Sequence, residues 1–404
     1  MENNNIYDIC IVGAGFSGLV LAIKSARAGL LVSLIESNQY VGRRILSTGN
    51  GRCNFTNSNM GPEFYYSNSN LDFIKDQHQE LIDFMRGLGL ISKSLDGYYY
   101  PITNQAKTVR TLLENEINNH ENIDLYLNCT CKEIDKKDVF IVSASDKKIR
   151  ARNVAIATGG QAAPTLGTTK LAYKTALKFG MKVTELSPAL VGLESDDICL
   201  KSLAGLRALG QVSYRGHSCQ GEIQFNKDGV SGYPVMCISR FVGFDGLHKN
   251  LSELHIDFLP YFTREKARAE IKDRFDKHKE SQISTALYGI CPEKAIDQVL
   301  QEARIYSDTR VSKLDEEDLD YLLDSFKDFK ISLKGTKGFN SAQVTAGGVS
   351  LEDVDLNTLM SKLQSGLYFM GEALDVDGIC GGYNLQWAYS SASLVATSLI
   401  EECK

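Results

Sequence analysis

Three glycines near the start of the chain have a spacing that suits a phosphate group. Residues Gly13 to Gly18 form the sequence GAGFSG, which fits the pattern G-x-G-x-x-G. In such a turn the first glycine allows a tight bend, and the second lets the main chain approach a pyrophosphate. The third lets a helix pack closely on a strand. Because the N-terminus of that helix carries free N–H groups and partial positive charge, the spacing predicts a dinucleotide-binding site.

The residues on either side of this turn predict the elements that would position it. Tyr7–Val12 is an apolar run typical of a buried parallel strand, and the helical pattern after the turn stops at Gly29. A second strand is expected at Leu31–Ile35 and ends on Glu36, where a carboxylate can accept hydrogen bonds from ribose hydroxyls. A glycine turn in some other α/β protein is the alternative interpretation. Strand, helix and acidic strand end all in place favour the nucleotide site.

An arginine- and glycine-rich stretch follows at residues 42–57, with the sequence GRRILSTGNGRCNFTN. Its glycines would allow the main chain to fold around a flat ring system. Asn50, Arg52 and Asn54 supply hydrogen-bond donors for the carbonyl edge of such a ring or for phosphates. A guanidinium near the ring would stabilise an anionic reduced flavin. These features agree with a flavin cradle, which the family resemblance described below implies, the alternative being a solvated loop.

The remaining glycine-rich segments favour FAD over NAD as the resident dinucleotide. A second G-x-G-x-x-G does not occur in the sequence, so the single site is expected to hold the cofactor that stays bound. An apolar strand at 154–160 ends in Thr-Gly-Gly, and another at 366–372 ends in Gly-Glu. Residues 381–386 then open a helix whose N-terminus suits the pyrophosphate or the flavin ring.

The residues predicted to contact FAD come from these segments, with Cys131 added from a strand expected near the adenine. They are Gly13, Ala14, Gly15, Phe16, Ser17, Gly18, Glu36, Ser37, Gly42, Arg43, Gly49, Asn50, Gly51, Arg52, Cys53, Asn54, Cys131, Ala157, Thr158, Gly159, Gly160, Gly371, Glu372, Gly381, Gly382, Tyr383, Asn384 and Leu385.

The chain resembles a family of bacterial flavoproteins that includes aminoacetone-oxidase-like and bile-acid-inducible NAD(P)/FAD-dependent oxidoreductases, and that is also linked to ribosomal RNA dihydrouridine synthesis. The resemblance implies an α/β fold with a Rossmann-like FAD-binding domain interrupted by a β-barrel-like segment and a helical segment. It is carried by blocks that span most of the chain, at 42–57, 97–109, 157–160, 187–193, 221–235, 342–355 and 366–391.

The domain organisation follows from this resemblance and from local patterns. We expect residues 1–190 and 335–404 to form the FAD-binding domain, 191–260 a β-barrel-like substrate domain and 261–334 a helical domain. In the last of these, basic and acidic side chains are interleaved. That pattern is interpreted as a solvated face, with a docking surface for RNA as the alternative.

Several secondary elements are also predicted inside the FAD-binding domain. Leu71–Leu88 carries helical periodicity, and another helix is expected to start near Asn104. Residues 123–156 alternate in the manner of a β-meander.

Composition narrows the class of protein. The net charge of −6 argues against a general nucleic-acid binder. Ten cysteines without a C-x-x-C pair are expected to be reduced thiols, and six dispersed histidines predict no metal site. The chain shows no charged leader and no apolar run of membrane-spanning length, so a cytoplasmic protein is expected.

No pattern of residues indicates a nucleophile–base triad, so the flavin would carry the difficult chemical step. The catalytic residue stays unassigned. Candidates for proton donation are Cys53, Tyr99, Tyr100, Asp375 and Asp377.

The resemblance implies an oxidoreductase with tightly bound FAD that takes hydride from NAD(P)H, a transient reductant. It would deliver the hydride to a C=C bond conjugated with a carbonyl in a small molecule. Reduction of the uridine C5=C6 bond in ribosomal RNA is one alternative, because that bond is also conjugated with a carbonyl. Oxidation of aminoacetone or another amine is a second, and a flavin-binding protein without turnover is a third. The choice between NADH and NADPH and the oligomeric state stay open.

Overall fold

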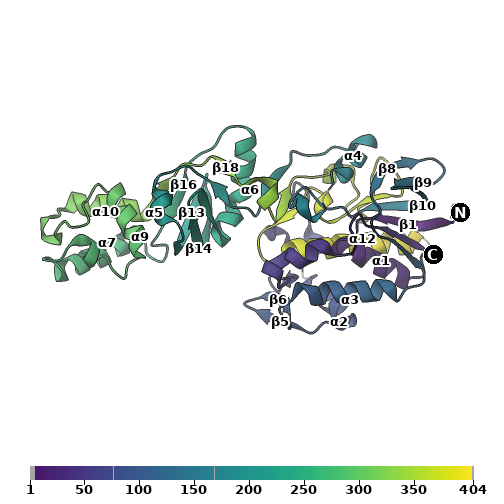
Figure 1. Ribbon diagram of the computed structural model, residues 1–404, viewed down its shortest axis with the longest axis horizontal. Coiled ribbons are helices and arrows are strands. Elements are labelled where there is room, and N and C mark those ends of the chain that lie inside the picture. The colour runs from purple at the N-terminus through teal and green to yellow at the C-terminus, as the bar shows by residue number, and fades with distance from the viewer. Residues whose placement is uncertain (1–4, 76, 168, 403–404) are drawn as a thin grey trace. The chain divides into compact units, whose positions relative to one another are not determined.

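The computed structural model describes residues 5–75, 77–167 and 169–402. They form two compact units (Figure 1). Unit 1 comprises Met1–Leu186 and Val344–Lys404, and unit 2 comprises Ser187–Gln343. Each unit has its own hydrophobic core. The chain therefore leaves unit 1 once and returns to it once.

Unit 1 is built on a seven-stranded sheet. Its strands are β1 (Ile6–Val12), β2 (Val32–Ile35), β7 (Ile123–Tyr126), β8 (Cys131–Lys136), β9 (Phe140–Ala144), β10 (Lys147–Ile156) and β20 (Leu367–Phe369). The order is β7-β2-β1-β10-β9-β8, and β20 also pairs with β10. The pairs of β1 with β2 and β10, of β2 with β7 and of β10 with β20 are parallel. This arrangement confirms the predicted α/β fold with a Rossmann-like parallel sheet.

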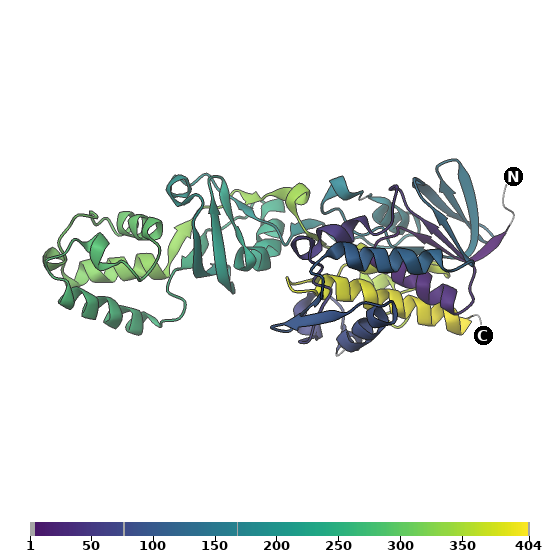
Figure 2. The same ribbon diagram turned by 60° about the horizontal axis from the view of Figure 1, so that its bottom comes forward.

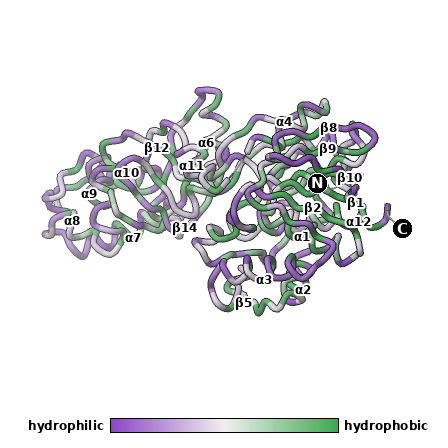
Figure 3. The backbone as a smooth tube through the Cα atoms, turned by 45° about the vertical axis from the view of Figure 1, so that its right-hand side comes forward, coloured by the Kyte–Doolittle hydropathy of each residue, from purple (hydrophilic) through white to green (hydrophobic). Residues whose placement is uncertain are grey.

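Helices cover this sheet because its central strands are apolar on both faces. The helices of unit 1 are α1 (Phe16–Arg27), α2 (His78–Gly87), α3 (Ala106–Asn118), α4 (Leu171–Lys178) and α12 (Tyr383–Glu402). Figures 1 and 2 show α1 and α12 side by side, although they come from opposite ends of the sequence. Hydrophobic segments gather in and around the sheet, as the green parts of the tube in Figure 3 show.

The predicted local elements of unit 1 differ from the observed ones in detail. The helix expected at Leu71–Leu88 is shorter, because α2 begins only at His78 after a single 3-10 turn. The helix expected near Asn104 begins at Ala106, since Asn104 has a positive φ of 53° that a helix does not allow. Strands β8, β9 and β10 form the predicted antiparallel meander, whereas β7 joins β2 in parallel.

Small strands complete unit 1 close to the turns of interest. They are β3 (Thr56–Asn57), β4 (Tyr65–Tyr66), β5 (Ser92–Leu95), β6 (Tyr98–Pro101), β19 (Val344–Ala346) and β21 (Asp377–Gly378). The order β3-β6-β5 forms one small sheet, and β21 pairs with β4. Through these pairings, the segments that follow β2 contact one another and the segment that precedes α12.

Unit 2 contains a second seven-stranded sheet, in the order β17-β16-β13-β14-β15-β12-β18, in which all the described strand pairs are antiparallel. Its strands are β12 (Leu193–Glu194), β13 (Arg207–Tyr214), β14 (His217–Asn226), β15 (Gly229–Gly232), β16 (Leu254–Asp257), β17 (Phe329–Ile331) and β18 (Gly335–Thr336). Its helices are α5 (Cys199–Leu203), α6 (Tyr233–Leu247), α7 (Arg264–Lys277), α8 (Ile283–Ala286), α9 (Glu293–Glu302), α10 (Glu316–Lys327) and α11 (Gly338–Ser341).

Two expectations for this part of the chain need correction. The run of strands expected over Val191–Leu259 is interrupted by α6, a 15-residue helix that begins with Tyr233-Pro234, where proline favours a helix start. The segment 261–334 does not form a separate unit, because β17 returns to the sheet and pairs with β16. Its helices and the strands of the sheet share one hydrophobic core.

The close packing of α1 on β1 gives a test of the fold. A Cβ atom added at Gly18 would overlap the carbonyl oxygen of Gly13, whereas one added at Gly87 would meet nothing within 4 Å. We expect Gly18→Ala to lower the free energy of unfolding by about 2 kcal/mol or more, because main-chain atoms have to move apart. Gly87→Ala, at the end of α2, should be neutral or stabilising by up to about 1 kcal/mol. Urea unfolding followed by circular dichroism measures both, and equal stability of the two variants would contradict the packing.

Candidate functional site

The glycine turn after β1 leaves main-chain atoms open to a ligand. Gly13 has a φ of 105°, and a Cβ there would lie 2.6 Å from the carbonyl oxygen of Ala157. Gly15 is different, because a Cβ at this position would have only one neighbour, 3.9 Å away. The surrounding protein would therefore accept a side chain at position 15. Glycine is expected at such a position when a phosphate group has to approach the main chain closely. Helix α1 begins directly after Gly15, a residue without a side chain that could cap the first N–H groups of the helix.

Glu36 lies where the sequence predicted it, at the end of β2. The side chain is buried, with 8% of its surface exposed. Its Oε2 accepts a hydrogen bond of 2.9 Å from the main-chain N–H of Ala14, and its Oε1 accepts from both nitrogens of Asn38. These contacts fix the carboxylate beside the glycine turn. Oε1 also accepts from Ser37 Oγ at 3.3 Å, whereas Oε2, within the described residues, accepts only from Ala14 and keeps one acceptor position for a ribose hydroxyl.

The arginine-rich stretch folds as a compact loop against the turn. Gly42 adopts a left-handed conformation with a φ of 67°, and its N–H donates to the carbonyl of Ala14 at 2.8 Å. The single turns that follow are broken at Thr48, Gly49 and Asn50. A Cβ at Gly49 would lie 2.8 Å from the nitrogen of Asn54. The loop therefore closes on itself through glycine.

The same loop also contacts the start of α12. Thr56 Oγ1 donates to Gln386 Oε1 at 2.6 Å, and Asn57 Nδ2 donates to the carbonyl of Gly381 at 3.3 Å. A Cβ at Gly382 would lie 2.8 Å from the carbonyl oxygen of Thr56. Residues more than 300 positions apart in the sequence thus meet at the N-terminus of a long helix.

A partly buried polar cluster forms where these segments meet the end of β10. Arg44 Nη2 lies 3.2 Å from Glu372 Oε2, and a Cβ at Gly159 would be 3.0 Å from Arg44 Nη1. Within the described part of the chain, Arg44 Nη1, Thr158 Oγ1 and the hydroxyl of Tyr173 are buried without a hydrogen-bond partner. Buried polar atoms are nearly always paired, so these three indicate a polar ligand.

Tyr173 belongs to this cluster although it comes from α4. It is 5% exposed, and burial raises the pKa of its phenol, with Glu372 and Asp375 acting in the same direction and Arg44 against them. The phenol therefore stays protonated across the physiological range. A protonated hydroxyl that lacks a partner inside the protein is available as a donor to a bound molecule.

Thr345, at the centre of β19, holds the loop after β10 in place. Its Oγ1 accepts hydrogen bonds from the main-chain nitrogens of Gln161 and Ala162, at 2.8 and 3.0 Å. Its own nitrogen donates to Glu372 Oε1 at 2.9 Å. A Cβ at Gly160 would lie 2.5 Å from that same carboxylate oxygen. The small residues of the Thr-Gly-Gly segment are thus required by close contacts.

The remaining predicted cofactor residues take varied positions. Arg43 donates to Asn38 Oδ1 at 2.7 Å, which fixes the loop beside Glu36. Arg52 is exposed, and its guanidinium lies 5.2 Å from the ring centroid of Tyr100. Cys131 begins β8, where burial raises the pKa of its thiol to about 12. Whether these residues contact FAD stays a prediction.

The candidate proton donors differ in their access to solvent. Cys53 is fully buried, and burial raises the pKa of its thiol to about 12. Asp377 is 2% exposed, on β21. Tyr99 and Tyr100 are partly exposed on β6. These candidates thus range from fully covered to partly exposed side chains.

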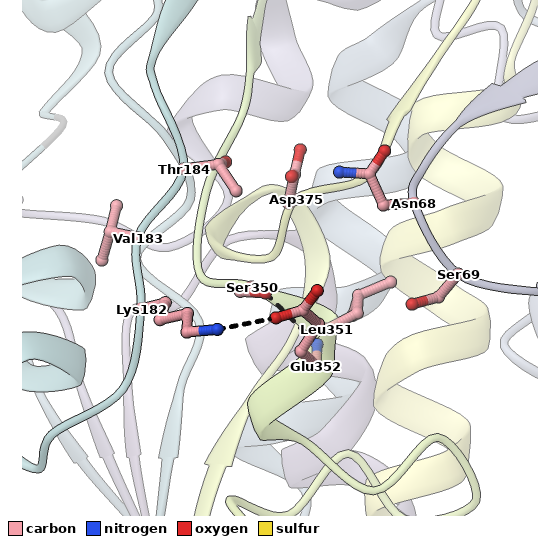
Figure 4. A pocket seen from close by; sticks show the side chains of 9 residues that line it. All are labelled: Asn68, Ser69, Lys182, Val183, Thr184, Ser350, Leu351, Glu352 and Asp375. Atoms are coloured by element: carbon pink, nitrogen blue, oxygen red, sulfur yellow. Dashed lines mark hydrogen bonds and ion pairs between the residues drawn. The ribbon is translucent and has the colours of Figure 1, made fainter.

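Asp375 lines a polar pocket of about 290 Å³ in unit 1 (Figure 4). Lys182 and Glu352 form an ion pair of 2.9 Å along its wall, with both side chains mostly exposed. Thr184 and Asn68 face the same space. Of the predicted site residues, Asp375 alone borders this pocket, which is otherwise lined by residues outside the cofactor segments.

Sequence patterns missed three residues of the cluster. Arg44 stood beside the predicted Arg43 in the same stretch, and its double-arginine sequence offered no means of choosing between the two. Tyr173 and Thr345 lie on elements without any motif. Only the fold connects them with Glu372. Thr345 donates its N–H to that carboxylate, and the charge of Glu372 helps to raise the pKa of the Tyr173 phenol.

The described residues contain no group of three or more His, Cys, Asp or Glu side chains placed to hold a metal ion. None of the helices in this part of the chain is long and apolar enough to cross a membrane.

Comparison with known proteins identifies the family. The model of the HI0933-like protein Rossmann domain matches residues 7–398. The chain belongs to the HI0933-like family. A 3-dehydro-bile acid delta(4,6)-reductase of Clostridium scindens is 34% identical, with 97% of this chain and 99% of that protein covered. A ribosomal RNA dihydrouridine synthase of Haemophilus influenzae is 29% identical, with 96% and 97% covered.

Solved structures agree at the level of the fold. A 3-ketosteroid-delta4-(5alpha)-dehydrogenase of Rhodococcus jostii matches with a TM-score of 0.51 and 12% identity, over 99% of this chain and 98% of that one. The HI0933-like family consists of FAD-dependent oxidoreductases, and this member is a flavoprotein oxidoreductase of the Rossmann type. The resemblance drawn from the sequence blocks is therefore confirmed.

Arg44 provides a test of the cluster. We expect Arg44→Met to raise the dissociation constant for FAD about 10- to 100-fold, because one charge-assisted hydrogen bond contributes about 1.5–3 kcal/mol. Retention of FAD after ultrafiltration measures the effect through flavin absorbance. Arg86→Met is the matched control, since Arg86 is exposed and pairs with Asp83 on its own helix. Wild-type retention in the Arg44 variant would show that the guanidinium does not face the cofactor.

Proposed function

We propose that this flavoprotein reduces a C=C bond conjugated with a carbonyl in a small molecule, with NAD(P)H as the source of hydride. The observation that supports this most directly is the 34% identity, along nearly the whole chain, to a protein named as a 3-dehydro-bile acid delta(4,6)-reductase. That name describes reduction of double bonds in the 4 and 6 positions of a 3-oxo compound. The proposed substrate class is therefore a polycyclic or similar enone.

Unit 1 offers groups that can bind the separate parts of FAD. The turn at Gly13–Gly18 and the start of α12 offer main-chain N–H groups to the pyrophosphate, and Glu36 offers a carboxylate to the ribose. FAD, when bound, supplies the transfer of hydride between a donor and an acceptor. Arg44 is paired with Glu372 through Nη2, and within the described residues its Nη1 is left to donate a hydrogen bond to a bound group.

Tyr173 is proposed as the proton donor. Hydride addition to the β carbon of an enone leaves an enolate, and a proton has to reach the α carbon. The Tyr173 hydroxyl is buried, protonated and without a partner in the described structure, and it shares a cluster with Arg44 and Glu372. Burial disfavours the phenolate, so the Tyr173 O–H holds its proton until a basic centre such as an enolate lies beside it.

Reduction of uridine in ribosomal RNA is the second candidate function. It is supported by 29% identity to the dihydrouridine synthase of Haemophilus influenzae over 96% of this chain. The reacting bond is chemically similar, so unit 1 could serve either substrate. The difference must lie in how the substrate is bound.

The charges of unit 2 favour a small molecule over RNA. Residues 261–334 contain 14 Lys and Arg but 16 Asp and Glu, a balance of 14 − 16 = −2. On α7, Arg264, Arg268 and Lys272 pair with acidic side chains of α10. RNA binding depends on uncompensated basic side chains that contact phosphates. Lys277 and Lys279 also pair with nearby acidic side chains of the same segment. The positive charge of these five residues is thus compensated within the protein.

The decisive experiment is anaerobic reduction of the purified yellow protein by NADH or NADPH, followed by addition of acceptors. We expect the flavin to bleach with one of the two nucleotides and to reoxidise rapidly with a steroid or bile-acid enone. The absorbance of the flavin follows both steps. The saturated analogue of the same steroid is the control, because it lacks the acceptor bond.

Each alternative function has its own outcome in this experiment. Reoxidation by ribosomal RNA fragments but not by enones would support dihydrouridine synthesis. Peroxide formed from aminoacetone under air would support amine oxidation. A flavin that no nucleotide, amine or artificial reductant bleaches would leave a binding protein without turnover.

The role of Tyr173 is tested by Tyr173→Phe. We expect kcat for the enone to fall about 10²- to 10⁴-fold, the usual contribution of a general acid. Stability and FAD content should be unchanged, because the variant removes a hydroxyl that has no partner inside the protein. Tyr306→Phe, which alters an exposed tyrosine, serves as the matched control. A Tyr173 variant with the wild-type rate would remove this residue from the mechanism.

A further inference from the structure

One face of unit 2 brings two cysteines from different elements together. Residues 217, 219 and 221 of β14 point to the same side of the sheet, because side chains alternate along a strand. Residues 233, 237 and 241 of α6 lie along one side of the helix, at spacings of four. Helix α6 packs against β14 (Figure 1).

Contacts at both ends of this face set the alignment of the two elements. The rings of His217 and Phe241 stack with centroids 3.5 Å apart. At the other end, a Cβ at Gly221 would lie 3.2 Å from both Tyr233 and Pro234. The strand and the helix therefore run antiparallel, in a fixed alignment. The positions between these two contacts are 219 on the strand and 237 on the helix.

Both of these intermediate positions are cysteines. Cys219 and Cys237 are reduced and partly exposed, and their side chains are hydrogen-bonded to each other. Because the strand and the helix pack against each other in this alignment, the two thiols lie at facing positions, and such proximity is what a disulfide requires. Solvent access and a neighbouring thiol are the two conditions for reversible oxidation.

Cys219 also differs from other thiols of the protein in its acidity. The hydrogen bond from Cys237 lowers the pKa of the Cys219 thiol below its ordinary value, although burial acts against it. Burial raises the pKa of Cys199 to about 11 and that of Cys291 to about 12. Since the thiolate is the nucleophile, Cys219 is the reactive member of the pair.

We propose that Cys219 and Cys237 form a reversible dithiol–disulfide site that reacts with low-molecular-weight disulfides such as glutathione disulfide. Both cysteines belong to unit 2.

The reaction is two successive thiol–disulfide exchanges. The Cys219 thiolate attacks one sulfur of the small disulfide, which forms a mixed disulfide and releases one small thiolate. The Cys237 thiolate then attacks the Cys219 sulfur, which breaks the mixed disulfide and releases the second small thiolate. The protein gives up two electrons and two protons, and the small disulfide becomes two thiols. An excess of the reduced thiol reverses both steps.

The test uses the full-length, FAD-loaded protein in buffers of graded glutathione disulfide content. After alkylation of the remaining thiols under denaturing conditions, we expect intact-mass analysis to show two fewer alkylated cysteines. Peptide mapping should identify a bond between Cys219 and Cys237 that dithiothreitol removes. This measurement is made on the wild-type chain, so it does not depend on whether a variant folds.

Variants then separate the roles of the two cysteines. Cys237→Ser should accumulate a stable glutathione adduct on Cys219, because the resolving thiol is gone. Cys199→Ser and Cys291→Ser are matched controls in the same unit and should form the disulfide as the wild type does. At neutral pH, Cys219 should be alkylated about tenfold faster than Cys199, since its larger thiolate fraction outweighs its lower intrinsic nucleophilicity.

Three results would overturn the proposal. Full alkylation of both thiols after oxidation would show that they do not react with small disulfides. A persistent glutathione adduct on wild-type Cys219 would show that Cys237 cannot reach it. A bond mapped to other cysteines would place the reactive pair elsewhere in the chain.

Discussion

The close approach of main chain to main chain at the end of β1 is the constraint on which the candidate site depends. Gly13 and Gly18 lie against each other and Gly13 against Ala157, with no room for a side chain at either glycine. Because of this contact, the start of α1, the end of β10 and the loop after β2 meet at one place. The residues that project there come from both ends of the sequence, and small shifts of the turn would separate them.

The partly buried polar cluster depends on that meeting point for its charge balance. Arg44 and Glu372 neutralise each other, and Thr345 donates its N–H to the same carboxylate. Both side chains of this pair stay partly exposed, so solvent offsets part of the cost of burying their charges. In the described structure, Arg44 Nη1 and the Tyr173 hydroxyl have no hydrogen-bond partner. Such unpartnered atoms are typical of a site that binds a polar ligand, and they distinguish this cluster from an ordinary ion pair.

In unit 2, the functional interpretation of the basic side chains changes once their acidic partners are known. In the sequence, the basic residues of 261–334 fit either a solvated face or an RNA-docking surface. In the fold, acidic side chains of α10 lie beside those of α7, so that the positive charge is compensated locally. The long-range field that draws nucleic acids depends on net charge over a surface, which is slightly negative here.

The sequence by itself determined the Rossmann-like sheet, the glycine turn at Gly13–Gly18, the place of Glu36 and the family, because each depends on local spacing along a strand, a turn and a helix. Tertiary structure decided what the spacing could not show. It showed that Arg44 pairs with Glu372 and that Thr345 donates to the same carboxylate. The charge of Glu372 also helps to raise the pKa of the Tyr173 phenol. The strands and helices of unit 2 share one core. The physical reason is that burial and pairing arise only when distant segments exclude water together, and no pattern within one segment records which partners it will meet.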